Sequence, residues 1–274
     1  MNKSFVKWAG GKYDLLPTLI DIIQQCPGLG GRFIEPFVGG GALTLNIPLK
    51  VPKIINDVNP GLISVWIALE SGEFYIDVAQ TYFIPENNTE EEFYRIRTQF
   101  NAGDTWEAKR PYHFLYLNRH CFNGLCRYNK QGKFNVPYGG YKTIYFPEKE
   151  LRHAMEVMKN TRVLNMDFAD VMNMATEGDV VYCDPPYIPL SETSAFVGYS
   201  KGGFTMDDQI RLRDRALRLR DRGVTVIISN NDTPLARKLY AKADDILSVQ
   251  VAKRISCKAD GRKKQREVIA IYKP

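Results

Sequence analysis

The stretch Asp179-Val-Val-Tyr-Cys-Asp-Pro-Pro-Tyr187 decides the fold, because an apolar run ends in it abruptly at an acid and two prolines. The run from Val180 to Cys183 is typical of a strand buried in a parallel sheet. Proline lacks an N–H and fixes φ, so the strand must end just after Asp184. We therefore predict an α/β fold with Asp184 at the carboxyl edge of the sheet, where such folds bind ligands.

The groups at that edge suit the transfer of a methyl group to the exocyclic amine of adenine. This amine is a poor nucleophile because its lone pair is delocalised into the ring. Asp184 and the carbonyl of Pro185 would each accept one of its two hydrogens, while Tyr187 stacks on the face of the base. The alternative interpretation of the motif is an ordinary turn from a strand into a loop.

The composition is that of a globular protein. The chain has 274 residues, of which 44% are hydrophobic and 25% charged, enough for one large domain or a domain with an insertion. A net charge of +6 and a pI near 8.9 permit a polyanionic partner. Without an apolar run of membrane-spanning length or a signal-like start, the sequence predicts a cytoplasmic protein with no membrane contact.

The cysteine pattern predicts free thiols and no metal site. The five cysteines are odd in number and form no paired CxxC spacing. His120 with Cys121 and Cys126 is the alternative metal set, but a fourth ligand is missing and the spacing matches no zinc pattern.

Two glycine-containing stretches near the start predict a nucleoside-containing cofactor. Lys7-Trp-Ala-Gly-Gly-Lys12 precedes a predicted helix at 15–23, whose free N–H groups would donate to a ligand carboxylate. A strand at 32–35 runs into Pro36-Phe-Val-Gly-Gly-Gly-Ala42, for which we predict a turn and a second helix. A strand at 53–57 then ends in Asp57, where a carboxylate can hold a ribose diol.

The turn is neither a dinucleotide fingerprint nor a phosphate loop. These parts together favour S-adenosyl-L-methionine, which has a ribose and an amino-acid end but no phosphate. The alternative is that Asp57 and Asn59 only cap the next helix.

The alternation of strand and helix lapses from residue 60 to about residue 146. We expect helices there, with capping boxes at 89–92 and 104–107. Strand signals resume at 162–164 and continue through 180–183, 224–228, 246–251 and 268–272, with an amphipathic helix at 207–222. The predicted division is a first catalytic part at 1–59, a target-recognition region at 60–147 and a second catalytic part at 148–274.

Two basic segments predict contact with DNA. Between Asn118 and Phe146 there are five cations and no acid, with aromatic residues between them. Two short segments about the turn at 129–132 predict a β-hairpin, which is narrow enough for the major groove. The alternative is an edge hairpin whose lysines prevent aggregation. A second basic loop is predicted at 253–266, where we favour phosphate contact over mere solubility.

With these motifs in their order, the chain resembles the DNA adenine-N6 methyltransferases of the Dam type, the D12 class. The resemblance covers residues 7–272 and is carried by Lys7-Trp-Ala-Gly-Gly-Lys12, Glu35-Pro-Phe-Val-Gly39, Leu117-Asn-Arg119, Asn123-Gly-Leu-Cys-Arg127, Phe134-Asn-Val-Pro137 and Asp184-Pro-Pro-Tyr187. It implies a seven-stranded Rossmann-like sheet with an inserted helical and β-hairpin DNA-recognition region. It also implies methyl transfer from S-adenosyl-L-methionine to N6 of a flipped-out adenine in double-stranded DNA, within GATC.

The resemblance also implies roles for individual residues. Lys7 and Arg127 would read guanines, Leu125 and Pro137 would pack against thymine, and Phe122 stands where the family often has a tyrosine that wedges into the duplex. The implied catalytic residues are Asp184, Pro185 and Tyr187. The implied cofactor-binding residues are Trp8, Gly10, Lys12, Phe37, Gly39, Asp57, Asp167, Phe168 and Asp184. The implied DNA-binding residues are Lys7, Arg119, Phe122, Asn123, Leu125, Arg127, Asn135, Pro137 and Tyr141.

Two other functions stay open at this point. The same pocket chemistry would serve adenine-N6 or cytosine-N4 methylation of another nucleic acid. A non-catalytic DNA-binding regulator is the alternative outside enzymes. A zinc base deaminase is excluded because the chain has no His-x-Glu with Pro-Cys-x-x-Cys. The oligomeric state stays open as well.

Overall fold

The computed structural model describes residues 1–26, 30–103, 107–189, 203–251 and 265–274. The chain divides into two compact units. The first unit comprises Met1–Tyr13, Gly39–Ile47 and Asp57–Asn165, and the second comprises Asp14–Val38, Pro48–Asn56 and Met166–Pro274. Each unit therefore joins segments that are far apart in the sequence. The predicted functional division at residues 59 and 147 stays a prediction.

Seven strands form a mixed sheet in the order β3-β2-β1-β4-β5-β7-β6, which confirms the predicted seven-stranded α/β fold. Strands β2, β1, β4 and β5 are parallel, and β7 is antiparallel to both β5 and β6. The order reverses between β1 and β4, at the type of switch point where open α/β sheets bind ligands. The strands are β1 (Phe33–Glu35), β2 (Lys53–Asn56), β3 (Thr161–Leu164), β4 (Val180–Cys183), β5 (Thr225–Asn231), β6 (Asp245–Val251) and β7 (Gln265–Tyr272).

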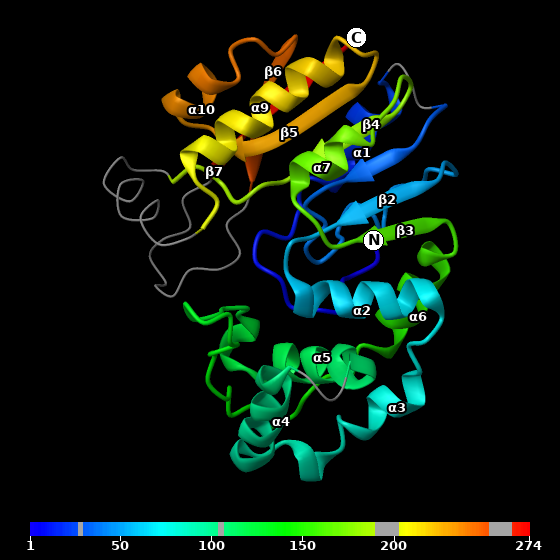
Figure 1. Ribbon diagram of the computed structural model, residues 1–274, viewed down its shortest axis with the longest axis vertical. Coiled ribbons are helices and arrows are strands. Elements are labelled where there is room, and N and C mark those ends of the chain that lie inside the picture. The colour runs from blue at the N-terminus through cyan, green and yellow to red at the C-terminus, as the bar shows by residue number, and fades with distance from the viewer. Residues whose placement is uncertain (27–29, 104–106, 190–202, 252–264) are drawn as a thin grey trace. The chain divides into compact units, whose positions relative to one another are not determined.

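The core of the second unit lies around β4, whose four residues are all buried, as predicted. Figure 1 shows α9 (Met206–Arg220) lying along β5, and α9 also contacts α7 (Phe168–Asn173). Its buried Leu212, Ala216 and Leu219 recur at helical spacing, which confirms the predicted amphipathic helix. The other helices in the described part of this unit are α1 (Leu16–Gln24), with a proline in its first turn, and α10 (Pro234–Leu239).

The first unit contains most of the helices. Helix α5 contacts both α2 and α4, and the burial of Phe93, Ile96 and Phe100 confirms the spacing predicted for α4. Thr89 accepts a hydrogen bond from the Glu92 N–H, so one half of the first predicted capping box is confirmed. Residues 104–106 of the second box lie outside the described residues. The elements are α2 (Pro60–Ser71), α3 (Ile76–Thr81), η1 (Pro85–Asn87), α4 (Glu90–Ala102), η2 (Glu107–Lys109), α5 (Arg110–His120), η3 (Phe122–Gly124) and α6 (Glu148–Met158).

The prediction of a helix directly after the glycine turn is wrong. Residues 39–47 form successive turns, with hydrogen bonds from Leu45 N to Gly41 O and from Ile47 N to Leu43 O. Pro48 follows, which leaves too few residues between it and the glycines to repay helix nucleation. The side chain of Asn46 also donates to the carbonyl of Ala42 and so competes for backbone groups.

The predicted β-hairpin is only partly confirmed. Two isolated antiparallel bridges, Cys121 with Tyr138 and Tyr128 with Phe134, flank the predicted turn. The residues from Asn118 to His120, at the start of the basic stretch, belong to the end of helix α5, which is buried along its length. The flanking strands β6 and β7 of the second basic loop pair as expected, and residues 252–264 of that loop lie outside the described residues.

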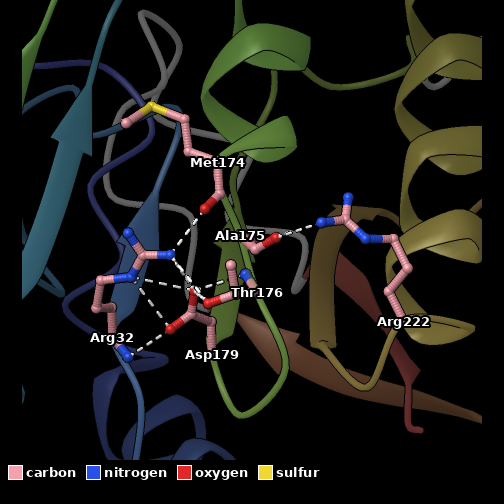
Figure 2. Close-up of polar contacts among 6 residues, drawn as sticks. All are labelled: Arg32, Met174, Ala175, Thr176, Asp179 and Arg222. Carbon is pink, nitrogen blue, oxygen red and sulfur yellow. Dashed lines mark hydrogen bonds and ion pairs between the residues drawn. The ribbon is translucent and has the colours of Figure 1, made fainter.

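An ion pair between a partly exposed arginine and a buried aspartate joins the amino ends of β1 and β4. Arg32 Nη2 lies 2.6 Å from Asp179 Oδ2, and the Arg32 backbone N–H donates to Asp179 Oδ1 at 2.6 Å. Figure 2 shows the same guanidinium donating to the Met174 carbonyl, beside the bond from Arg222 to Ala175 O. Burial alone raises the pKa of Asp179, but hydrogen bonds from Arg32 and Thr176 outweigh it and hold the pKa below its usual value.

Asp179→Asn is expected to lower the free energy of unfolding by about 2–4 kcal/mol, somewhat less than for a fully buried pair because the Arg32 side chain is 32% exposed. Because folding lowers the pKa of Asp179, the difference between wild type and variant should be constant at neutral pH. It should shrink as the pH falls below about 4 and through the lowered pKa.

Urea unfolding at a series of pH values measures this difference. Glu156→Gln, which removes an exposed pair with Lys159, is the control and should change stability by at most about 0.5 kcal/mol. A difference for Asp179→Asn that does not depend on pH would contradict the assigned role of the pair.

Candidate active site and nucleic-acid interface

The carboxyl edge of the second unit presents Phe37 and Asp184 from neighbouring strands. Strands β1 and β4 are parallel and pair directly, so their carboxyl ends meet at one edge. Phe37 follows β1 by two residues, and Asp184 follows β4 at once, as predicted. Asp184 is half-buried and Pro185 is buried. This edge therefore carries an acid and an aromatic ring together.

The loop after β4 is fixed by polar side chains of α9 and β5. Gln209 Nε2 donates to the Pro186 carbonyl at 2.8 Å. Asn230 Oδ1 accepts the Ile188 N–H at 2.9 Å, and Asn231 Nδ2 donates to the Ile188 carbonyl at 2.7 Å. Sequence reasoning missed these residues, although two asparagines at the end of an apolar strand are an available signal. The backbone of the Asp184-Pro-Pro-Tyr187 motif is thus held by hydrogen bonds on both sides of Tyr187.

The Tyr187 hydroxyl donates to Glu267 Oε2 at 2.6 Å. Glu267 lies on β7 and is 9% exposed, so the bond is shielded from water. Burial, with the nearby carboxylates of Asp184 and Glu267, raises the pKa of Tyr187 well above its usual value, so the hydroxyl keeps its proton and remains a donor. Sequence reasoning missed Glu267, which is eighty residues from its partner.

An aromatic cluster lies in the same unit. The rings of Phe37 and Phe168 stack with centroids 5.3 Å apart, and Phe204 lies edge-on to Phe37 at 5.6 Å. Arg211 lies 4.9 Å over the Phe168 ring and pairs with Asp167 at 2.8 Å. The predicted residues Phe37, Asp167 and Phe168 are therefore close together, and Phe204 and Arg211 extend the set. An apolar face beside a carboxylate fits a purine ring and its amine.

In the first unit, the glycine turn binds Asp57 directly. The Gly39 N–H donates to Asp57 Oδ2 at 3.1 Å, and the Asn59 N–H donates to Oδ1 at 2.9 Å. Burial raises the pKa of Asp57, and the hydrogen bonds from Asn59, Gly39 and Val58 act against this rise. Each carboxylate oxygen has a second acceptor position, so the group fits the two hydroxyls of a ribose.

The glycine turn also packs directly on Trp8. Gly39 has a φ of +48°, and a Cβ at this position would lie 2.6 Å from Trp8 Nε1. The Trp66 indole donates to the Gly39 carbonyl at 3.2 Å. Lys12 is buried and donates to the Gly10 carbonyl at 2.8 Å. Trp8 and Asp57, predicted to serve the same cofactor, are thus joined through Gly39.

Lys7 joins the start of the chain to the end of α5. Its backbone N–H and C=O exchange hydrogen bonds of 2.7 and 2.8 Å with the Asn118 side chain. Its ammonium donates to the Arg119 carbonyl and lies 4.2 Å from the centre of the Tyr141 ring. Burial, together with the charge of Arg119, lowers the pKa of Lys7. The predicted residues Lys7 and Tyr141 therefore contact each other.

Two large apolar side chains are exposed next to Lys7. Phe122 is 49% exposed and Leu125 is 45% exposed, on either side of a tight turn. Asn123 in that turn has a φ of +54°, and Gly124 has no room for a Cβ beside the Lys7 side chain. A strained turn that presents apolar side chains to solvent is typical of a binding surface.

The other predicted DNA contacts differ in exposure. Arg127 is exposed and donates to Asn135 Oδ1 at 2.8 Å and to the Asn135 carbonyl at 3.3 Å, and Pro137 is exposed nearby in the sequence. Arg119, by contrast, is 9% exposed, and its Nε donates to the Phe5 carbonyl at 3.0 Å. Because this contact uses Arg119 inside the unit, we do not include it among the proposed DNA contacts.

A family model described as D12 class N6 adenine-specific DNA methyltransferase matches residues 8–255. The chain belongs to this family. It is 43% identical over 275 residues to the DNA adenine methylase of Escherichia coli K12, covering all of this chain and 96% of that protein. It is 42% identical over 276 residues to the DNA adenine methylase of Vibrio cholerae O1 El Tor Inaba N16961, with 100% and 97% covered. The DNA adenine methylase of Serratia marcescens is 42% identical, with 99% of each chain covered.

Membership confirms the family that the sequence motifs predicted. The protein is a DNA methyltransferase specific for N6 of adenine, and its methyl donor is S-adenosyl-L-methionine. A solved precorrin-6y C5,15-methyltransferase from Geobacter metallireducens is a distant likeness, with a TM-score of 0.42 and 9% identity over 98% of this chain and 93% of that chain. Among the described residues, no helix is long and apolar enough to span a membrane.

Gly39→Ala is expected to weaken binding of S-adenosylhomocysteine by about tenfold or more, because a methyl group there is strained and collides with Trp8. Isothermal titration calorimetry measures the loss. Gly72→Ala is the matched control, because Gly72 has a φ of +75° but nothing within 4 Å of an added Cβ. Equal losses in both variants would show that backbone strain, and not the contact with Trp8, is responsible.

Proposed function

We propose that this methyltransferase modifies the adenine of GATC in double-stranded DNA, and that the adenine leaves the duplex before methylation. The observation that carries the proposal is the pair of exposed apolar side chains, Phe122 and Leu125, on the left-handed turn beside Lys7. A base inside a duplex cannot enter an active site, so an enzyme of this type must replace lost stacking with its own side chains. The family resemblance of Asn123-Gly-Leu-Cys-Arg127 supports GATC as the site.

We propose one role for each of the DNA-contacting residues, which are Lys7 and residues of the stretch from Phe122 to Tyr141, here called the recognition segment. Phe122 inserts into the duplex as the adenine leaves, using its ring face alone because it lacks the hydroxyl of a tyrosine. Asn123 helps fill the gap. Lys7 and Arg127 contact guanines, because arginine can bind the O6 and N7 acceptors of guanine together. Leu125 and Pro137 pack against the thymine methyl group, and Asn135 and Tyr141 hold Arg127 and Lys7 in place.

For cofactor binding, we propose candidate residues within each unit by itself. In the second unit, the stacked rings of Phe37 and Phe168, with the carboxylate of Asp167, suit an adenine ring and its amine. In the first unit, the Asp57 carboxylate suits ribose hydroxyls, and Trp8, Gly10, Lys12 and Gly39 suit the amino-acid end of S-adenosyl-L-methionine. The bound cofactor supplies the sulfonium methyl group.

The catalytic proposal concerns Asp184, Pro185 and Tyr187. Asp184 and the Pro185 carbonyl accept the two hydrogens of the target amine, so that the nitrogen lone pair points at the methyl group. Tyr187 stacks on the base, and its bond to Glu267 fixes the position of the ring. The bonds from Gln209 and Asn230 keep the loop backbone in place, which limits the cost of orienting the amine. The DNA substrate also supports the predicted cytoplasmic location.

Tritiated methyl transfer onto oligonucleotides changed at each position of GATC tests the target. Duplexes with GATC should be methylated, and scrambled duplexes or RNA should not. Arg127→Ala should lower discrimination at one guanine by about 1–3 kcal/mol, while Lys130→Ala, exposed in the adjacent turn, should weaken binding to all sequences alike. Methylation of scrambled duplex or RNA at the same rate would overturn the proposed target, and an equal loss for Arg127→Ala on every sequence would make it a phosphate contact.

Asp184→Ala is expected to lower the rate of methyl transfer in single turnovers by about 100-fold or more, because one of the two acceptors for the amine hydrogens is lost. DNA affinity should stay within about threefold, since the recognition residues are unchanged. Asp221→Ala, an exposed acid after α9, is the control and should turn over normally. Normal turnover by Asp184→Ala would remove this residue from the mechanism.

A further inference from the structure

Asn59 contacts two parts of the first unit: Asp57, which binds the glycine turn, and the segment from Cys126 to Tyr128. Its backbone N–H donates to Asp57 Oδ1 at 2.9 Å. Its side-chain Oδ1 accepts from the Tyr128 hydroxyl at 3.1 Å, and its Nδ2 donates to Cys126 Sγ at 3.4 Å. Cys126 and Tyr128 flank Arg127, which we propose reads a guanine. One residue thus joins the carboxylate proposed for the ribose to the segment proposed for DNA.

The Tyr128 hydroxyl packs tightly against the first turn of α2. A Cβ at Gly61, in the first turn of α2, would lie 2.7 Å from the Tyr128 hydroxyl and 2.6 Å from Phe114 Cδ2. The Phe134 ring lies edge-on to Tyr128 at 5.8 Å. Burial raises the pKa of Tyr128, and it raises the pKa of Cys126 to about 11, so both groups keep their protons. The Tyr128 hydroxyl therefore stays protonated and remains a hydrogen-bond donor to Asn59.

The Asn59 side chain is also the N-cap of α2. Its Oδ1 accepts from the N–H groups of Gly61 and Leu62 at 3.0 Å each, in addition to Tyr128. Three donors converge on one oxygen, which fixes the plane of the carboxamide and the backbone that carries it. That same backbone presents the N–H that binds Asp57. The orientation of Asn59 therefore fixes one of the N–H groups that hold the Asp57 carboxylate, beside that of Gly39.

We infer that Tyr128 and Cys126 are positioning residues for Asp57 and act through Asn59, so that the segment that reads DNA also sets the affinity for the cofactor. This inference rests on the proposed role of Asp57 in holding the ribose, and it adds two residues that the family motifs do not place at the cofactor. Its physical basis is that the position of a hydrogen-bonded carboxylate depends on the groups that hold its donors.

Tyr128→Phe tests the inference without DNA, because it keeps the ring and removes only the hydroxyl. The dissociation constant of S-adenosylhomocysteine, measured by calorimetry, should rise about threefold to tenfold, as for the loss of one buried hydrogen bond. Tyr138→Phe is the matched control. Its hydroxyl lies on the same segment but donates to Asn88 at 2.8 Å, so its removal should change the affinity by less than about twofold.

A double-mutant cycle with Asp57→Asn separates positioning from general stability. If Tyr128 acts through Asp57, Tyr128→Phe should cause no further loss of affinity in the Asp57→Asn background. Additive losses, or an unchanged affinity in Tyr128→Phe alone, would overturn the inference. Should Tyr128→Phe not fold, Cys126→Ala removes the other contact and should raise the dissociation constant about twofold to threefold; an unchanged value in that variant would overturn the inference.

The same measurements keep the two proposals apart. If Asp57→Asn itself leaves the affinity for S-adenosylhomocysteine unchanged, the proposed cofactor role of Asp57 fails, and the inference fails with it. If Asp57→Asn weakens binding but Tyr128→Phe does not, the inference alone fails.

Discussion

The parallel pairing of β1 with β4 is the constraint on which the proposed catalytic edge depends. Its register, Phe33 with Val180 and Ile34 with Val181, is fixed at the amino ends by the ion pair of Arg32 with the buried Asp179. Because side chains alternate between the two faces of a strand, a shift of one residue would move every side chain to the other face of the sheet. The ion pair at one edge thus determines which groups reach the opposite edge.

Buried polar side chains then hold the loop that follows β4 at this edge. The loop after β4 is tied to α9, β5 and β7 through Gln209, Asn230 and Glu267. Breaking one of these buried hydrogen bonds would leave a polar group without a partner, which costs free energy. The bonds therefore favour one loop conformation. Methyl transfer needs this order, because the reacting nitrogen must be aligned with the methyl group before it reacts.

The start of the recognition segment is supported by a buried helix. Helix α5 is buried along its length, and the chain beyond it turns through Asn123 and Gly124 with positive φ to expose Phe122 and Leu125. The buried helix supports a short turn with positive φ whose apolar side chains, Phe122 and Leu125, stay about half exposed. Covering exposed apolar surface lowers the free energy, which is why we propose that these side chains insert into stacked bases.

The sequence by itself determined the elements whose causes are local. Proline after an apolar run ended β4 at Asp184, asparagine before proline capped α2, and the ordered motifs identified the family. Only the tertiary structure decided that Arg119 is buried and that Tyr187 binds Glu267. These outcomes depend on partners tens of residues away, and neither hydrophobic period nor turn chemistry carries information about which distant polar group a folded chain brings into contact.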